Sequence, residues 1–330
     1  MTVSGPVAAT HPPEARRSAP AELTIIIVSW NVAPLLRQCL RSVISDAPDT
    51  SLQVVVVDNA SSDESVAMLR GEFPWVELIV NRANLGFARA SNQGLRLATA
   101  PLVLLLNPDT VVAPGALGIL THFLREHPDA GMLGPSIWSE DGTFQATSAR
   151  IMPTVGRLVA IDVFRIQKLP VVGRWFHKRL VSPYEPDVNQ EVQAISGAAM
   201  LIRRDLFEEG GGFGECFIHC GEDLDLCFRI RRAGWKIYFV PGARVVHLGG
   251  RSTRQAPVWA LVNAAISIQR YLERCFGRWP ARLYRLALQG IDAPVAILLG
   301  LVKSALGRQP AGDLRVRLQY ARGIWTWRPM

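Results

Sequence analysis

Residues 23–31 read LTIIIVSWN, and this stretch decides how the N-terminal part of the chain folds. A continuous run of β-branched and apolar side chains is typical of a strand buried on both faces, as in a parallel sheet covered by helices. The polar tripeptide Ser29-Trp30-Asn31 ends the run. We therefore predict a strand over 23–29 with polar side chains at its carboxyl end.

The same pattern recurs three times downstream, at spacings that leave room for helices. Further near-continuous apolar runs, which predict buried strands, cover residues 52–58, 76–80 and 102–106. Between the runs, apolar spacing and helix-start residues predict helices over 34–44, from a Ser62 cap to Arg70, and over 86–98. Strands that alternate with helices predict an α/β fold with a mostly parallel sheet covered on both faces.

Polar residues follow every one of these strands. They are Ser29-Trp30-Asn31, Asp58-Asn59, Asn81 with Asn84, and Asn107-Pro108-Asp109. A parallel sheet brings the carboxyl ends of its strands to one edge, which is where such folds bind their ligands. We therefore expect these residues to form a single site.

The second half of the chain is less regular. After a helix predicted over 115–126, residues 138–191 show no steady period and carry several prolines and basic residues. We predict that they form loops and short helices that lie over the sheet as a lid. An ordered block returns at 192–203. A Gly-rich stretch at 210–214, a predicted helix over 222–232 and a last strand over 236–240 follow it.

The composition excludes disorder of the whole chain and leaves several partners open. With 330 residues, 49% of them hydrophobic, the chain can bury a large core. Its net charge of +8 suits phosphates, nucleic acid or an anionic membrane surface. Beyond His247 lie thirteen basic and three acidic residues, so this part carries the entire positive excess. It has no aromatic platform or known nucleic-acid-binding motif, which disfavours a nucleic-acid partner.

The ends of the chain and its apolar segments bear on location. Residues 1–22 are rich in Ala and Pro and predict a loose tail without a secretory signal. The apolar segment 294–306 is interrupted by Lys303 and is shorter than the ~20 residues of a membrane span. We expect no transmembrane helix and a cytoplasmic protein.

The five cysteines agree with this location. An odd number of cysteines without a secretory signal favours reducing cytosol over a disulfide framework. Cys216, Cys220 and Cys227 beside His219 are a candidate zinc site. That alternative is disfavoured because no Cys-x-x-Cys pair is present.

Asp109 and His247 are candidate metal ligands. Asp109 follows a buried strand and is preceded by Asn107, so a carboxylate and an amide oxygen stand at the sheet edge and suit a hard divalent cation. The alternative is an Asn-Pro-Asp turn. A lone histidine is more often structural than a ligand. His247 precedes Gly249-Gly250-Arg251, and this neighbourhood strengthens the case for a role at a metal or a diphosphate.

Three acids open the helix predicted over 222–232. Acids in a first turn can act solely as favourable partners of the helix dipole. Asp225 is expected to pair with Arg229, four residues later on the same face. Asp223 follows a Gly-rich and aromatic segment that would place it against a pocket, so it is the candidate general base.

Two common nucleotide-binding motifs are missing from the sequence. There is no Gly-x-x-x-x-Gly-Lys-Ser/Thr loop, and no Gly-x-Gly-x-x-Gly lies between the first strand and the first helix. Their absence counts against kinases and dehydrogenases. A nucleotidyltransferase is disfavoured because no Gly- and Arg-rich loop follows the first strand.

Taken together in chain order, these motifs resemble those of the family 2 glycosyltransferases, and most closely a rhamnosyltransferase-like branch. The resemblance covers about residues 23–252. The motifs that carry it are IVSWN (27–31), VVDNASSD (56–63), NRANLGF (81–87), LNPD (106–109), Gly197-Ala198, GGF (211–213), Glu222-Asp223 and His247.

The resemblance implies a GT-A fold, with a nucleotide-binding half over about 23–135, an acceptor half over about 190–252 and a basic helical extension over 253–330. By position, the nucleotide sugar would contact Val28, Trp30, Asp58, Asn84, Gly86 and Asn107. The acceptor and donor-sugar pocket would include Gly197, Ala198 and Glu222. Asp109 and His247 would hold a divalent cation, Mg²⁺ or Mn²⁺, and Asp223 would be the base of an inverting displacement.

The sequence departs from the family pattern at several positions. Gly214 stands where the pattern has an aspartate, which puts acceptor affinity in doubt more than catalysis. Ile218, His219 and Cys220 replace a more aromatic run. Asn107 stands at the first position of the family's Asp-x-Asp motif, so the cation would be held by fewer charges.

The resemblance also implies the partners. The donor would be dTDP-rhamnose, with UDP- and GDP-linked sugars as alternatives, and the acceptor a cell-envelope glycan on a lipid carrier. The basic tail would then lie on the cytosolic face of an anionic membrane, or pack as a helical subdomain on the catalytic core. The rival function is a catalytically degenerate, membrane-associated protein that binds glycan or other enzymes.

Overall fold

The computed structural model describes residues 20–46, 51–249, 257–306 and 311–327. Nearly all of the tail predicted over 1–22 lies outside these ranges, as do Gly250 and Arg251 beside the predicted metal site.

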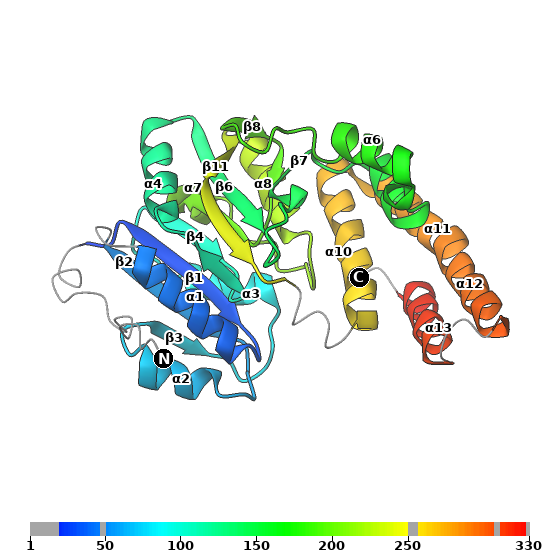
Figure 1. Ribbon diagram of the computed structural model, residues 1–330, viewed down its shortest axis with the longest axis horizontal. Helices are drawn as coiled ribbons and strands as arrows, with labels where there is room; N and C mark the ends of the chain where they lie inside the picture. The colour runs from blue at the N-terminus through cyan, green and yellow to red at the C-terminus, as the bar shows by residue number, and fades with distance from the viewer. Residues whose placement is uncertain (1–19, 47–50, 250–256, 307–310, 328–330) are drawn as a thin grey trace, which may run out of the picture.

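A nine-stranded mixed sheet forms the body of the molecule (Figure 1). Its first four strands are β1 (Leu23–Ser29), β2 (Leu52–Asp58), β3 (Glu77–Val80) and β4 (Leu102–Leu106). They pair in parallel in the order β3-β2-β1-β4, which confirms the prediction of a mostly parallel sheet.

The sheet continues with strands from the second half of the chain. These are β10 (Ala199–Arg203), β6 (Ala130–Trp138), β11 (Lys236–His247) and β5 (Thr110–Val112), with β8 (Gln190–Val192) beside β11. The strand β10 runs antiparallel to β4 and β6, whereas β11 runs parallel to β6. Antiparallel pairing of β11 with β5 then sets His247 opposite Thr110.

Helices cover both faces of the sheet because side chains alternate along each strand. Ile25 and Ile27 of β1 share a core with α1 (Ala33–Asp46), α2 (Ser65–Glu72) and α4 (Ala116–Glu126). Ile26 points to the other face. It joins a core with α3 (Phe87–Leu95), α7 (Arg204–Glu209) and α8 (Glu222–Arg232).

Three local predictions were wrong. Ser62 does not cap α2, because its N–H and hydroxyl donate to Asn31 and the helix begins at Ser65. The third strand is not fully buried, because β3 is the edge of the sheet and one flank of it has no neighbour among the described strands. The last strand does not stop at Val240 but continues to His247 through an irregularity between Val240 and Arg244.

The irregular middle of the chain packs partly on the sheet and partly on the C-terminal helices, whereas the prediction placed it over the sheet as a lid. It contains η2 (Ala146–Ser148), β7 (Ala149–Arg150), α5 (Val155–Leu158), η3 (Val159–Val163), η4 (Ile166–Lys168) and α6 (Pro170–Leu180). Its turn η2 contacts β6, whereas α5 and η3 contact the C-terminal helices. The two-residue strand β7 pairs with β9 (Ala194–Ile195) in a separate two-stranded sheet, which ties this segment to the chain just before β10.

The C-terminal extension is helical, as predicted, and consists of α10 (Pro257–Phe276), α11 (Arg278–Ala287), η5 (Leu288–Asp292), α12 (Ala293–Ala305) and α13 (Ala311–Thr326). The helix α10 packs on α8, and its Tyr271 is buried in the same core as Leu224. Of the two roles expected for the basic tail, α10 therefore has the second, which is packing on the catalytic core as part of a helical subdomain. Figure 1 shows α6 and the outer helices α11 to α13 at the end of the molecule away from β1 to β3.

The helices α11, η5 and α12 run on as one helix over 278–305. Its 28 residues are long and apolar enough to cross a membrane by length and composition. The expectation that this region is too short was wrong, because it counted only the apolar core from 294 and missed the preceding turns.

Candidate active site

Polar side chains at the ends of β1, β2 and β3 form one hydrogen-bonded network, as the strand-end pattern predicted. Asn59, directly after β2, is buried at its centre. Its amide nitrogen donates to the side chain of Asn84 at 2.9 Å, and its amide oxygen accepts from Asn81 Nδ2 at 3.1 Å. Asn84 Oδ1 also accepts the N–H of Gly86, the residue that precedes α3.

Asp58 is the buried acid of this strand-end group. One carboxylate oxygen accepts the N–H of Ser61 at 2.9 Å. The other, Oδ2, is buried and has no hydrogen-bond partner in the described part of the protein. A buried carboxylate oxygen left unpaired is costly, so this atom suits a donor from a bound ligand. Val28 is buried beside it on β1, and Trp30 is partly exposed.

A second group of polar residues fixes the loop between β2 and α2. Asn31 has a left-handed backbone with φ of 54°. Its N–H donates to Ser61 Oγ, while its side-chain oxygen accepts from Ser62. Asp63 accepts the N–H of Ala33 at the start of α1. This loop is therefore fastened to the end of β1 rather than free.

Asp109 and His247 come together as the sequence predicted, although they lie far apart in the chain. The Nε2 atom of His247 lies 3.3 Å from Asp109 Oδ1, and both side chains are mostly buried. The backbone repeats this contact, because the N–H of Leu248 donates to the carbonyl of Asp109. The Nδ1 atom of His247 lies 3.5 Å from Gln145 Oε1. The antiparallel pairing of β5 with β11 produces this juxtaposition.

Asn107 is anchored through its backbone. Its N–H donates to the carbonyl of Ala198 at 2.9 Å, and its own carbonyl accepts the Thr110 hydroxyl at 2.6 Å. Ala198 belongs to the predicted acceptor pocket and Asn107 to the predicted nucleotide site. The two predicted halves therefore meet at this hydrogen bond.

Asp223 lies in the first turn of α8, next to Gly197. Its Oδ2 atom is 2.5 Å from a guanidinium nitrogen of Arg150. A Cβ atom on Gly197 would lie 3.3 Å from Asp223 Cβ and 3.5 Å from Oδ2. Gly197 thus leaves the space that the carboxylate occupies.

Glu222 precedes Asp223 and has an unusual protonation behaviour. Burial, with a smaller contribution from the Asp223 carboxylate, raises the pKa of Glu222 to about 8. A carboxyl with such a pKa carries its proton at neutral pH. Glu222 can therefore donate a hydrogen bond, which adds to the pocket role that the sequence analysis expected of it.

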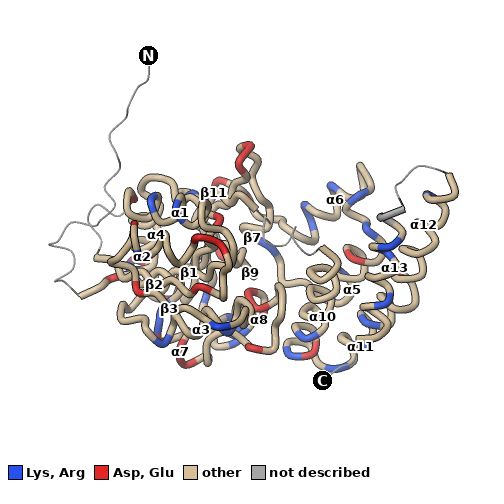
Figure 2. The backbone as a smooth tube through the Cα atoms, turned by 90° about the horizontal axis from the view of Figure 1, so that it is seen from below, with Lys and Arg blue, Asp and Glu red and all other residues tan. Residues whose placement is uncertain are grey.

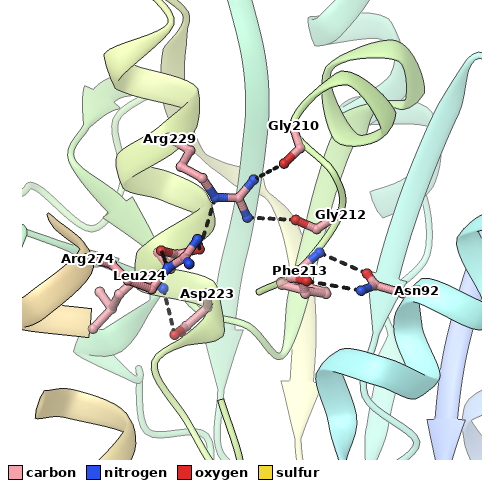
Figure 3. Close-up of polar contacts among 9 residues, drawn as sticks. Asn92, Gly210, Gly212, Phe213, Asp223, Leu224, Arg229 and Arg274 are labelled. Carbon is pink, nitrogen blue, oxygen red and sulfur yellow. Dashed lines mark hydrogen bonds and ion pairs between the residues drawn. The ribbon is translucent and has the colours of Figure 1, made fainter. Parts of the chain in front are cut away.

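Asp225 is structural, as its pairing with Arg229 indicated. The Arg229 guanidinium donates to the Asp225 carboxylate at 2.9 Å. It also donates to the carbonyls of Gly210 and Gly212, as Figure 3 shows. The buried Asp225 carboxylate also pairs with Arg274 of α10, at 2.7 Å. One acid thereby joins α8, the glycine loop and the C-terminal extension.

The glycine loop is also held from the nucleotide half. Asn92 of α3 accepts the N–H of Phe213 at 2.8 Å and donates to its carbonyl at 3.0 Å (Figure 3). Gly212 has φ of +70°, and a Cβ there would lie 2.4 Å from Asn92 Oδ1. At Gly214 a side chain would meet Phe217 and the Asp225 carboxylate. The departure from the family's aspartate at Gly214 thus avoids two adjacent acids.

The candidate zinc site is not supported. In the described ranges, no group of three His, Cys, Asp or Glu side chains is arranged to hold a metal ion. All five cysteines are free thiols. Cys227 lies near Cys216 and Cys220 in the sequence, but its side chain is buried in the hydrophobic core under α8, where it contributes to packing.

Comparison with known proteins identifies the family. The model of the family described as "Glycosyltransferase like family 2" matches residues 20–265. The chain is a family 2 glycosyltransferase. The match covers every predicted site residue, so the fold and the enzyme class expected from the motifs are both confirmed.

The glycosyltransferase has relatives of known activity. It is 31% identical to the N-acetylglucosaminyl-diphospho-decaprenol L-rhamnosyltransferase of Mycobacterium tuberculosis, over 89% of this chain and 97% of that one. It is 27% identical to the pre-mycofactocin glycosyltransferase of the same organism, over 72% of this chain and 45% of the relative.

A solved structure of similar fold is GalNAc-T7 with UDP, GalNAc and Mn²⁺. The TM-score is 0.53 at 18% identity, over 92% of this chain and 55% of that one. This similarity confirms the GT-A fold of the glycosyltransferase.

Two residues at the glycosyltransferase site were missed by the sequence analysis. Arg150 contacts Asp223, and Gln145 contacts His247. Both lie in the irregular middle segment, which has no period that would place them. A lone arginine in β7 carries no signal until β7 pairs with β9.

Proposed function

We propose that this glycosyltransferase moves rhamnose from dTDP-rhamnose to N-acetylglucosamine carried on a polyprenyl diphosphate, with inversion at the anomeric carbon. The relative with this acceptor aligns over nearly the whole of both chains. The observation that carries the proposal is the arrangement around Gly197-Ala198. The Ala198 carbonyl accepts the N–H of Asn107, two residues before Asp109, and a Cβ on Gly197 would contact the Asp223 side chain, which pairs with Arg150.

The donor nucleotide would bind at the ends of β1 and β2. The unpaired Oδ2 of Asp58 offers an acceptor for a hydroxyl or ring N–H of the nucleoside, and Val28 supplies an apolar surface beside it. Asn84 and Gly86 belong to the network that fixes the rim of this site. Trp30 would contribute its partly exposed ring. UDP- and GDP-linked sugars are the alternative donors.

The pair Asp109 and His247 fits a divalent cation, Mg²⁺ or Mn²⁺. A carboxylate oxygen and an imidazole nitrogen converge at 3.3 Å, and both are ligand types that such ions accept. When bound, the cation would offset negative charge on the leaving diphosphate. With two such protein groups and a neutral Asn107 nearby, the donor diphosphate would have to supply further ligands.

Asp223 would remove the proton from the attacking acceptor hydroxyl. Its Oδ1 accepts the N–H of Leu224 and its Oδ2 faces Arg150, so the carboxylate is held in one orientation. Glu222, which carries its proton at neutral pH, would donate a hydrogen bond to the sugar or the acceptor. Ala198 and Gly197 would form the floor between the two substrates.

The acceptor implies a location. A polyprenyl-linked acceptor is held in a membrane, so we propose that the enzyme works peripherally on the cytosolic face, where nucleotide sugars are made. The rival function, a degenerate binding protein, has no positive support beyond Asn107 and Gly214. A side chain at Gly214 would crowd Phe217 and the Asp225 carboxylate, which gives this glycine a steric reason that is independent of catalysis.

The test is a transfer assay with purified protein and a short-chain polyprenyl-diphospho-GlcNAc. We expect a rhamnosylated product with dTDP-rhamnose and a metal, detected by mass spectrometry, with inverted configuration by NMR. Asp223→Asn should lower the rate by about 10²–10⁴-fold with unchanged donor affinity. If sugar is transferred only from UDP- or GDP-linked donors, dTDP-rhamnose is not the donor. If the protein binds a donor but transfers no sugar, the rival function of a catalytically degenerate binding protein is favoured.

A further inference from the structure

The long helix formed by α11, η5 and α12 leaves one apolar face uncovered. Within α11 and within α12, exposed apolar side chains recur at intervals of three and four residues, with η5 between the two sets. They include Trp279, Leu283 and Leu286 on α11 and Val295, Leu298 and Val302 on α12. Trp279 keeps 73% of its surface accessible, which is unusual for a side chain of that size. These side chains form a stripe along the outside of the molecule.

The helix α6 lies at the same end of the molecule, as Figures 1 and 2 show. It has an uncovered apolar face of its own. Gly173 and Phe176 are its buried side. Val171 is 73% exposed and Trp175 is 60% exposed. This helix comes from the middle of the chain, so the tertiary structure joins it to the extension.

Basic residues border both faces. Those on α6 are Arg174, Lys178 and Arg179, all exposed, and α6 contains no acid. On α11, Arg278 is exposed and Arg282 lies 5.5 Å from the ring of Trp279. Across residues 257–306 the sequence has two acids, Glu273 and Asp292, and Asp292 is buried. Apolar side chains with Trp, bordered by Arg and Lys, match the interface of an anionic bilayer.

The opposite side of the long helix is fastened by polar contacts at its middle. Asp292 accepts the hydroxyl of Tyr320 at 2.7 Å and pairs with Arg165 at 3.3 Å. One turn earlier, Gln289 donates to the carbonyl of Ile324 and accepts from Trp325. A helix that crossed a bilayer would have to break these bonds and carry Asp292 into hydrocarbon, which is costly. The helix is therefore long enough to span a membrane, but the polar contacts at its middle are incompatible with a position inside the bilayer.

The C-terminal helices that carry the exposed apolar stripe are also connected to α8, the helix that contains the proposed base Asp223. Arg274 of α10 pairs with Asp225 in the first turn of α8, two residues beyond Asp223. The next helix after α10 is α11, which carries the exposed stripe. A membrane below α11 would thus lie at a fixed position relative to the proposed base.

We propose that the outer faces of α6 and of α11–α12, called here the docking face, lie flat on an anionic lipid bilayer and do not cross it. The proposal deepens the proposed function, on which it rests for the lipid-linked acceptor. The exposed apolar and basic side chains that support membrane binding all lie on α6, α11 and α12, so this part of the proposal does not depend on the sugar-transfer site. A bilayer is favoured over a second protein copy by the basic border, because two such faces would repel each other.

The test is flotation of the full-length protein with vesicles of neutral phosphatidylcholine, and with vesicles that also contain phosphatidylglycerol. We expect binding to the anionic vesicles and release by high salt or alkaline carbonate. A spanning helix would resist that extraction, and no binding to anionic vesicles would equally overturn the proposal.

Matched variants locate the face. The variant Val171→Ser/Trp175→Ser/Trp279→Ser/Leu283→Ser should lower the bound fraction at least tenfold, as should Arg174→Glu/Lys178→Glu. The control Leu97→Ser/Ile119→Ser removes two exposed apolar side chains from the sheet domain and should bind as the wild type does. Equal binding by all variants, with circular dichroism showing that each is folded, would contradict the assignment. So would a concentration-dependent dimer that only the face variants lose.

The assay also separates this proposal from the proposed function. On a short-chain acceptor in solution, the face variants should turn over as the wild type does. On the same headgroup with a long chain in anionic vesicles, they should be slower by the loss in binding. If the wild type binds vesicles but transfers no sugar to either acceptor, the proposed function fails and the docking face stands.

Discussion

The guanidinium of Arg150 lies 2.5 Å from the Asp223 carboxylate, and the two residues come from segments 73 positions apart. The Nε atom of Arg150 is buried and has no hydrogen-bond partner in the described part of the chain. An arginine that uses one nitrogen on the proposed base and leaves another unpaired is suited to fix the base and to contact a substrate oxygen.

Arg150→Met should therefore lower kcat by about 100-fold with little change in donor affinity, because small displacements of a reacting group are costly. Arg150→Lys should restore part of the rate, since it keeps the charge. Arg125→Met, which removes an exposed arginine, is the control. Steady-state kinetics with each variant checks this, and an unchanged kcat would exclude a positioning role.

Gly197→Ala should displace the Asp223 carboxylate, since the added Cβ would lie 3.3 Å from Asp223 Cβ. We expect a fall in kcat of about tenfold or more, with a melting temperature close to that of the wild type. Gly118→Ala is the matched control, because its Cβ meets no atom within 4 Å in α4. If both variants keep full activity, the contact with Gly197 does not constrain the base.

Asp109→Ala and His247→Ala should each weaken metal-dependent donor binding by about tenfold or more, which corresponds to ~1.4 kcal/mol. Each removes one of the two groups that converge at 3.3 Å. Calorimetric titration of the donor with and without Mn²⁺ measures the loss. Asp141→Ala, at an exposed loop acid, should titrate normally. Unchanged titration by the Asp109 variant would remove it as a ligand.

Glu222→Gln should change how stability depends on pH. Burial raises the pKa of Glu222 to about 8 from an ordinary value of 4.5, so between these values the folded chain holds a proton that the unfolded chain has lost. The free energy of unfolding of the wild type therefore falls as pH rises from about 4.5 to about 8. The glutamine lacks this effect, so the variant should gain in relative melting temperature as the pH is raised through this range. A difference between the two melting temperatures that stays constant across the range would contradict the shift.

Asp225→Asn should cost about 1–3 kcal/mol of stability, because it removes the buried carboxylate with which Arg229 and the partly exposed Arg274 pair. Urea unfolding measures this. Asp129→Asn, at an exposed acid paired with Lys236, should unfold nearly as the wild type does. If Asp225→Asn hardly changes the free energy of unfolding, the two arginines are hydrogen-bonded to water in the variant and the ion pairs do not stabilise the fold.

The sequence alone determined the four parallel strands of the N-terminal part, whereas β5, β6 and β8 were not predicted. Strands such as 23–29 and 52–58 are near-continuous apolar runs, and a run of this kind has one stable environment, which is burial on both faces. The polar residues that end those runs were then bound to meet, because parallel strands finish at one edge. For the same local reason, the pairing of Asp225 with Arg229 followed from spacing along one helix turn.

Only the tertiary structure decided which distant groups share a site. Arg150 sits in a two-residue strand with no period, and its meeting with Asp223 depends on the pairing of β7 with β9. Burial of Glu222, and thus its protonation, arises from packing that no local pattern encodes. For residues 278–305, the composition by itself shows that the helix is apolar and is bordered by basic residues. Which of its faces is uncovered depends on where Asp292 is fastened, because long-range contacts and not local spacing set the orientation of a helix.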